Sequence, residues 1–299
     1  MKLTTTKKAL VKSTRASVTR QAVAICALTM ACTPVFAQKG FDFGLKGNIQ
    51  TTSLINSNDQ AAGTELDYKN YTTMALGVSA GYSFNNHTGV EINILSSKQG
   101  QGYVGETSQI NGNSGLILSG LFASFALAQG IPFTGNYTAR ITTNVIKVPI
   151  LFRYTGNTTK KVYFSSFIGP QINILSKVKF TINDQDVSFS GSGNKPEDLY
   201  KKTTFDVVFG FGAGFNLSKN INLSVHLRLD YGLGDMEDKS FIPSGASDKF
   251  WPAGRASTHN ATGGGLISLN YKLIKKAPAA ATKTTPAAKP VAAPVKTKK

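Results

Sequence analysis

The strongest constraint on the fold of this chain is an alternation of apolar and polar residues with a period of two. Residues 221–234 read INLSVHLRLDYGLG, with a large apolar side chain at every odd position and a polar residue or glycine at every even one. Segments 203–217 and 73–84 show the same pattern. A helix, with its period of 3.6, would mix these two sets, whereas successive side chains of a strand point to opposite faces. The pattern therefore predicts β-strands.

Five further segments alternate less regularly and bring the predicted strand count to eight: 41–55, 89–99, 143–155, 161–176 and 263–274. Each of the eight is long enough for a tilted transmembrane strand, which needs about 9–11 residues. One face of each strand carries Phe, Leu, Ile and Tyr, and the other carries Gly, Ser, Asn and charged residues. Because an eight-stranded barrel has a narrow bore, we expect the small polar face to point inward and the apolar face to contact lipid.

The connections between these segments alternate in length. Short turns are predicted at 85–88, 156–160 and 218–220, and long loops at about 56–70, 101–142, 177–202 and 235–262. Outer-membrane barrels have short periplasmic turns and long external loops. An even number of strands then places both termini in the periplasm. The predicted fold is all-β: an eight-stranded antiparallel up-and-down transmembrane barrel with long external loops, formed by residues 38–274.

The first 37 residues have the pattern of a secretory signal peptide. Six Lys or Arg precede a short apolar core at 22–32, and Val35-Phe36-Ala37 supplies small residues at the two positions that signal peptidase reads. The apolar core is too short for a membrane anchor, so cleavage is predicted between Ala37 and Gln38. The signal peptide would direct export of the chain, and the predicted barrel would place it in the cell outer membrane.

Both cysteines of the chain, Cys26 and Cys32, lie inside this segment. The mature chain would then contain no disulfide and no thiolate metal site. An alternative is a lipoprotein in which Cys32 carries the lipid. Against it, Thr29 stands at the position where an apolar residue is usual.

The formal net charge of +17 resembles that of a nucleic-acid-binding protein, but its distribution does not. Residues 1–37 hold six basic residues and 275–299 hold seven, with no acidic residue in either segment. The rest of the chain holds 20 basic and 16 acidic residues. The basicity thus belongs to a targeting segment and a tail rather than to a groove, and we expect no nucleic-acid partner.

The C-terminal segment 275–299 is rich in Ala, Pro and Lys. Such a composition cannot form a core, so we expect a disordered periplasmic tail. Two interpretations remain open. The tail is simply solvated, or its lysines attach it electrostatically to an acidic periplasmic protein or to the cell wall.

The faces predicted to point inward carry a set of charged residues: Lys46, Glu91, Lys147, Arg153, Asp206, Arg228, Asp230 and Lys272. Buried charges without partners cost several kcal/mol each. We therefore expect them to form a closed ion-pair network that fills the bore. The alternative is a narrow pore or a ligand pocket.

Neither an enzyme nor a metal site is expected. The three histidines, His87, His226 and His259, fall on different predicted elements and no motif surrounds them. His226 could meet Asp230 or Asp206, but a polar histidine in a bore is more often part of a structural network. No Cys, His and carboxylate cluster has the spacing of metal ligands, and no cofactor is predicted.

Two local features do not fit the simple pattern. The segment LILSGLFASFALA at 116–128 is apolar but too short to span a membrane as a helix. It could form an extra hairpin with 102–112 that gives ten strands, a short helix that caps the lumen, or an exposed patch for a partner or for lipid. Pro149 and Pro170 lie inside predicted strands, where they cannot donate a ladder hydrogen bond, so bulges or frayed rims are expected there.

Taken in order, several motifs resemble the PorT-like outer-membrane β-barrel family of Bacteroidota. These are INILSSKQG at 92–100, VIKVPILFRY at 145–154, GPQINILSK at 169–177, FDVVFGFGAGF at 205–215, LRLDYGLGDM at 227–236 and GLISLNYKL at 265–273. The resemblance implies an eight-stranded antiparallel barrel and, for some members, a part in type IX secretion or gliding. Two features depart from the family: the long connection at 101–142, and Leu273 with a tail after it where the family usually ends on an aromatic residue.

The function expected from these observations is a structural or interaction role in the cell envelope, with support of protein secretion implied by the resemblance. A small pore or a ligand-binding transport barrel is the alternative, and an envelope enzyme is a more distant one. The partners expected are outer-membrane lipid, the barrel assembly machinery and, through the tail, a periplasmic or cell-wall component.

Overall fold

The computed structural model describes residues 40–110, 116–187, 195–244 and 246–273. The predicted signal peptide with its cleavage site between Ala37 and Gln38, and the predicted tail at 275–299, lie outside these ranges.

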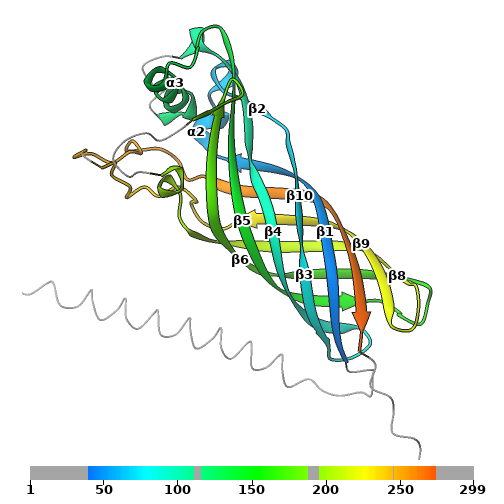
Figure 1. Cartoon of the computed structure of the whole chain (residues 1–299). Coiled ribbons are helices and arrows are strands. Elements are labelled where there is room, and N and C mark those ends of the chain that lie inside the picture. The colour runs from blue at the N-terminus through cyan, green and yellow to red at the C-terminus, as the bar shows by residue number, and fades with distance from the viewer. Residues whose placement is uncertain (1–39, 111–115, 188–194, 245, 274–299) are drawn as a thin grey trace, which may run out of the picture.

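Eight long antiparallel strands form a closed ring (Figure 1). They are β1 (Gly40–Ile55), β3 (Tyr71–Ser83), β4 (Thr88–Glu106), β5 (Asn136–Thr155), β6 (Val162–Ile182), β8 (Thr203–Asn216), β9 (Ile221–Gly232) and β10 (His259–Lys272). Each strand pairs with the next one along the ring, and β10 pairs with β1 to close it. The predicted eight-stranded up-and-down barrel is confirmed.

Two strands of three residues lie outside this ring. β2 (Asp67–Lys69) pairs with the far end of β4, and β7 (Gln185–Val187) pairs with the far end of β6. The short helices of the loops are α2 (Ser57–Gln60), η1 (Gly63–Glu65), η2 (Thr107–Gln109), α3 (Leu118–Gln129) and η4 (Pro196–Leu199). In the part of the chain that the structure describes, no helix combines the length and the apolar character needed to cross a membrane.

The alternating faces have the orientation that the sequence predicts. On β8 the side chains of Phe205, Phe209 and Phe211 are exposed, whereas Asp206 and Val208 between them are buried. On β6 the outward apolar side chains run from Val162 to Ile174. At about 3.3 Å per residue and a tilt of about 40°, this length covers about 30 Å, the thickness of the hydrocarbon core. We call this outward apolar surface the belt.

The two ends of the barrel differ. The three short turns and the described ends of the chain lie at one end, and α3 lies with the long loops at the other (Figure 1). Aromatic side chains gather on the outer wall near the short turns: Phe41, Tyr82, Phe84, Tyr154 and Tyr271. Such girdles are typical of the membrane interface of outer-membrane barrels. We refer to the two ends as the turn end and the loop end.

Three strands, β4, β5 and β6, extend past the others at the loop end. The alternation of inward and outward side chains along β6 is interrupted at Ser176. A β-bulge there shifts the register, so that Asn144 pairs with Lys177 and Val145 with Leu175. The bulge lets Val178 and Phe180 continue on the inner face. A strand that reads as ending at residue 176 therefore runs on to Ile182, because one extra residue resets the period of two.

The two prolines disturb the ladder in a different way from that expected. The β5–β6 ladder passes from the pair Pro149–Gln171 to the pair Phe152–Ile168 with unchanged register, and the two intervening pairs, one of which would include Pro170, are missing from it. The expectation of a bulge or a frayed rim at these positions is wrong. A proline removes one N–H donor without adding a residue, so the ladder has a gap inside the barrel wall while the register is kept.

Of the three alternatives left open for the segment at 116–128, the structure shows the short helix, α3, and not the extra hairpin. α3 buries Leu118, Phe122 and Ala126 along one stripe, and it ends at Gly130, which takes the left-handed conformation. The buried stripe joins an apolar cluster with the inner faces of the extended strands: Leu54, Tyr103, Tyr137, Ile141, Val178 and Phe180. We call this cluster the plug, because it fills the loop end of the barrel.

Candidate functional site

The middle of the bore is filled by a network of buried charges centred on Asp230. Its carboxylate contacts Lys147 Nζ at 2.8 Å and Arg228 Nε at 2.8 Å. Arg228 Nη2 also donates to Gln171 Oε1 at 2.6 Å, and Gln171 Nε2 donates to Asp206 Oδ2 at 3.0 Å. The side chains of the three paired residues are at most 1% exposed. This middle network links strands β5, β6, β8 and β9 across the bore.

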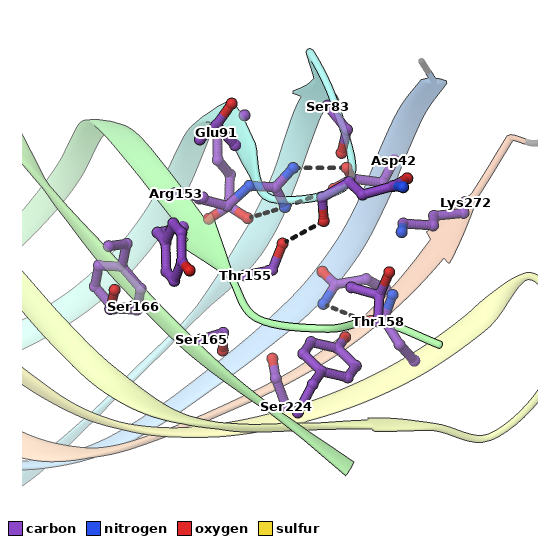
Figure 2. Close-up of a pocket in the computed structure, with 18 of the residues that line it drawn as sticks. Asp42, Ser83, Glu91, Arg153, Thr155, Thr158, Ser165, Ser166, Ser224 and Lys272 are labelled. Atoms are coloured by element: carbon purple, nitrogen blue, oxygen red, sulfur yellow. Dashed lines mark hydrogen bonds and ion pairs between the residues drawn. The ribbon is translucent and has the colours of Figure 1, made fainter. Parts of the chain in front are cut away.

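A second network lies toward the turn end (Figure 2). Arg153 contacts Asp42 at 2.7 Å and Glu91 at 3.1 Å, and Lys46 contacts the other oxygen of Glu91 at 2.7 Å. Asp42 is the one member of this turn-side network that the sequence analysis missed. The signal was present, since Asp42 and Lys46 are four residues apart on β1 and hence on the same face.

The eight inward charges chosen from the sequence thus divide into three groups. Lys46, Glu91 and Arg153 belong to the turn-side network. Lys147, Asp206, Arg228 and Asp230 belong to the middle network. Lys272 lines the mouth of the bore beside Asp42 and forms no ion pair within the described residues (Figure 2).

The turn-side network forms the wall of a cavity of about 70 Å³ that faces the turn end. Most of the residues that line it are polar and include Ser83, Thr158, Ser224 and Lys272 (Figure 2), beside the rings of Tyr163 and Phe167. A water molecule takes up about 30 Å³ in the liquid. The cavity therefore has room for a few waters or one small polar group.

His226 lies on the inner face of β9 and contacts Ser165 on β6, with 2.5 Å between Nε2 and Oγ. The possible contact of His226 with Asp230 or Asp206 is not formed, and both carboxylates belong to the middle network. Nδ1 of His226 is buried and has no hydrogen-bond partner within the described residues. A Ser–His pair is thus present, but no carboxylate orients its imidazole.

The other two histidines lie at opposite ends of the barrel, away from this pair in the fold. His87 is in the turn between β3 and β4 and contacts the carbonyl oxygen of Thr155 at 2.9 Å. His259 begins β10 and contacts the carbonyl oxygen of Gly232 at 3.0 Å. Among the residues that the structure describes, no three His, Cys, Asp or Glu side chains are grouped to hold a metal ion.

A third charged cluster lies among the long loops and was not predicted. Arg255, in the β9–β10 loop, binds Asp59 of α2 through both terminal nitrogens at 3.0 Å, and its Nη2 binds Glu237 at 2.8 Å. Arg255 Nη1 also donates to the carbonyl oxygen of Leu116, and Asp59 accepts from the backbone N–H of Leu118. We call these contacts the loop clamp, because they join three of the four long loops.

All three charged side chains of the loop clamp are 1% exposed. Arg255 also lies over the ring of Trp251, with 5.1 Å from Cζ to the ring centre. No periodic pattern marks these residues in the sequence, because loops have no repeating geometry. The only signal was the presence of isolated charges within long loops, which are usually solvated.

The two carboxylates of the loop clamp differ in their pKa. Burial raises the pKa of Asp59 above its ordinary value despite its hydrogen bonds from Arg255. Burial acts in the same direction on Glu237, but hydrogen bonds from Arg255, Lys239 and Thr258 together hold its pKa below the ordinary value. Ionised Asp59 therefore opposes folding. Its contribution to the free energy of unfolding becomes more favourable as the pH falls through its folded pKa. The stabilising contribution of ionised Glu237 to the folded state is present above its unfolded pKa and is lost as the pH falls through its folded pKa.

This difference predicts unequal effects of neutralising the two groups. Asp59→Asn is expected to lower the free energy of unfolding at pH 7 by less than about 1 kcal/mol, and Glu237→Gln by about 2–3 kcal/mol. Urea titration of the chain refolded into lipid vesicles measures both values. An Asp59→Asn cost equal to or larger than that of Glu237→Gln would contradict the assignment.

A closed ring of eight strands with an apolar outer wall and a charged bore defines a transmembrane barrel of the outer-membrane class. Residues 36–238 match the sequence model of a family described as the outer membrane protein beta-barrel domain. The match covers more than half of the chain, and the chain belongs to this family. The protein is therefore an outer-membrane β-barrel.

Several solved structures are similar to this chain. OprG from Pseudomonas aeruginosa is 14% identical, with 80% of this chain and 99% of that one covered and a TM-score of 0.38. Ail, the attachment invasion locus protein of Yersinia pestis, is 15% identical, with 79% and 99% covered and a TM-score of 0.34. The outer membrane protease OmpT from Escherichia coli is 9% identical, with 81% and 99% covered and a TM-score of 0.33. A search of curated protein sequences gives no match.

Proposed function

We propose that this protein is a closed barrel with a structural or interaction role in the cell envelope, and that it presents a preorganised set of loops at the cell surface. The observation that carries the proposal is the filled bore. The middle network crosses the bore with side chains that are at most 1% exposed, and the plug fills the loop end. A barrel that conducts ions would need a continuous polar path past the middle network and the plug. A barrel built to hold its loops in place benefits from the loop clamp.

In this proposal the turn end and both termini face the periplasm, and the long loops face outward. Lipid of the outer membrane and the barrel assembly machinery are then necessary partners, and the basic tail is available to a periplasmic or cell-wall component. The resemblance to the PorT-like family of Bacteroidota supports a place in a type IX-like secretion apparatus. Crosslinking in intact cells, followed by identification of what co-purifies, tests this role. Recovery of secretion components supports it, and recovery of only lipid-transport or nutrient-uptake proteins argues against it.

The filled bore makes a direct prediction about conductance. The full mature chain in a planar bilayer is expected to show no steady open channel at 100 mV, because buried ion pairs occupy the middle of the bore and the plug occupies its loop end. A variant that lacks residues 116–130 and carries Arg228→Ala loses parts of both barriers and is expected to show openings. Steady unitary conductance of the unmodified chain would favour the small-pore alternative.

Two alternative functions, ligand binding and hydrolysis, each rest on one observation. The cavity at the turn end favours a site for a small polar ligand, but its 70 Å³ excludes anything larger than a few water molecules without rearrangement. The Ser165–His226 contact favours hydrolysis, but the buried Nδ1 has no carboxylate partner within the described residues. We propose that the protein is not an enzyme. Loss of an envelope lipase or peptidase activity on His226→Ala, with the barrel still folded, would overturn this.

A further inference from the structure

The outer wall at the loop end carries a group of basic side chains on the extended strands β4, β5 and β6. These are Lys98, Arg140, Lys177 and Lys179, which we call the basic band. All four are exposed and lie on the outward-facing side of the alternation. The register brings them together, since Lys98 pairs with Asn144, Asn144 pairs with Lys177, and Lys179 pairs with Thr142. With about 4.8 Å between strands, Lys98 and Lys177 lie about 10 Å apart at their backbones.

The basic band begins where the belt ends. On β4 the last strongly exposed apolar residue before Lys98 is Ile94, and on β6 the last before Lys177 is Ile174. The separations along the strands are four and three residues, which places the backbones of Lys98 and Lys177 about 10 Å and about 8 Å from the edge of the hydrocarbon on a tilted strand. Lysine side chains can reach back over such a distance, so their ammonium groups lie at the level of lipid headgroups.

The band covers only one side of the barrel. On the opposite wall, the outward positions beyond the belt are uncharged: Thr51 and Ser53 on β1, and Ala261 on β10. A general attraction to the membrane surface would place basic residues around the whole circumference. Further exposed lysines adjoin the band: Lys69 on β2, and Lys201 and Lys202 just before β8. Basic residues at this level thus gather on one side of the barrel, which indicates a localised ligand instead.

Few acidic groups neutralise the band within the described residues. Lys179 contacts Asp186 at 2.8 Å, and both side chains are about half exposed, so this ion pair is weak. Glu197 lies nearby, and its Oε1 accepts from the backbone N–H of Val178. Arg140 lies over the ring of Tyr71, with 5.4 Å from Cζ to the ring centre, which leaves its charge intact. Lys98 and Lys177 form no ion pair in the described part of the chain.

We propose that the basic band binds the phosphate groups of a phosphorylated glycolipid in the outer leaflet of the outer membrane. Three observations carry this: the level of the band just past the belt, its clustering on one wall, and its shortage of carboxylates. Lysine is a point-charge ligand for phosphate, and each lysine near an anionic lipid surface contributes about fivefold in affinity. The inference rests on the proposed function in one respect, because it requires the loop end to face outward.

The test compares two triple variants of the full mature chain purified in mild detergent. The first replaces three lysines of the band: Lys98→Gln, Lys177→Gln and Lys179→Gln. The matched control replaces three exposed lysines at the turn end: Lys160→Gln, Lys161→Gln and Lys219→Gln. Native mass spectrometry with added diphosphoryl lipid A measures the apparent Kd. We expect the band variant to bind at least about tenfold more weakly, with the control within about twofold of wild type.

Two further arms identify the ligand chemistry. Dephosphorylated lipid A is expected to bind the wild type as weakly as diphosphoryl lipid A binds the band variant, and inorganic phosphate at the same concentration should not compete. Equal loss of affinity in both triple variants, or equal binding of the dephosphorylated lipid, would overturn the proposal.

Orientation is measured separately, so that the two proposals can fail independently. A membrane-impermeant maleimide applied to intact cells should label a Ser108→Cys variant at the loop end and leave a Thr159→Cys variant at the turn end unlabelled. The reverse labelling would refute the proposed orientation and the outer-leaflet assignment together. Correct labelling with no effect of the band variant on lipid A binding would overturn only the lipid site.

Discussion

Replacing Asp230 by leucine is expected to lower the free energy of unfolding of the barrel by about 3–5 kcal/mol. Among the residues that the structure describes, Asp230 is the sole carboxylate that contacts both Lys147 and Arg228, each at 2.8 Å, and all three side chains are at most 1% exposed. The substitution would leave two like charges buried without a counter-ion. The penalty is large because an unpaired buried charge loses its hydration and gains nothing in return.

Urea titration of the chain in lipid vesicles, followed by the heat-modifiable mobility of the folded barrel on gels, measures this change. The matched control is Asp186→Leu, which removes the carboxylate of the exposed pair with Lys179 and should cost less than about 0.5 kcal/mol. A double variant, Asp230→Leu with Lys147→Met, should recover part of the loss, because only one buried cation remains. If Asp230→Leu were as stable as the control, the bore would have to be hydrated enough to solvate both cations.

Replacing Arg255 by alanine is expected to release the long loops while the barrel stays folded. Asp59 and Glu237 would face each other as two buried carboxylates without their shared cation, and Leu116 would lose the donor to its carbonyl oxygen. We expect about 3–5 kcal/mol to be lost from the local stability of the loop end. Because α3 begins at Leu118, whose N–H donates to Asp59, its packing into the plug should weaken as well.

Hydrogen exchange of the α3 amides and limited proteolysis of intact cells both report on this change. The expected result is faster exchange in α3 and new cleavage in the long loops, with the gel mobility of the folded barrel unchanged. Arg255→Lys should behave much like Arg255→Ala, since a single ammonium cannot bridge both carboxylates bidentately. Arg140→Ala, which removes an exposed arginine that lies over Tyr71, is the control and should leave α3 protected. Unchanged exchange in Arg255→Ala would mean that the plug holds the loops without the loop clamp.

The sequence by itself determined the wall of the barrel. The period of two is a local property of an extended chain, so it assigned strands, their number and the face that each side chain takes. Because hydrocarbon tolerates only apolar groups, the large faces of β6, β8 and β9 could be placed outside before any contact was known. The same rule directed Lys147, Arg228 and Asp230 into the bore.

Only the tertiary structure decided which of these groups meet. Pairing across a bore depends on strand order, register and closure, and none of these is encoded in the spacing along one strand. Arg153 therefore binds Asp42, which is 111 residues away, and His226 contacts Ser165 rather than a carboxylate. The bulge at Ser176, the helix at 118–129 and the Arg255 clamp arise where the lipid constraint ends. In the loops no solvent boundary imposes a repeating pattern, so packing alone selects the conformation.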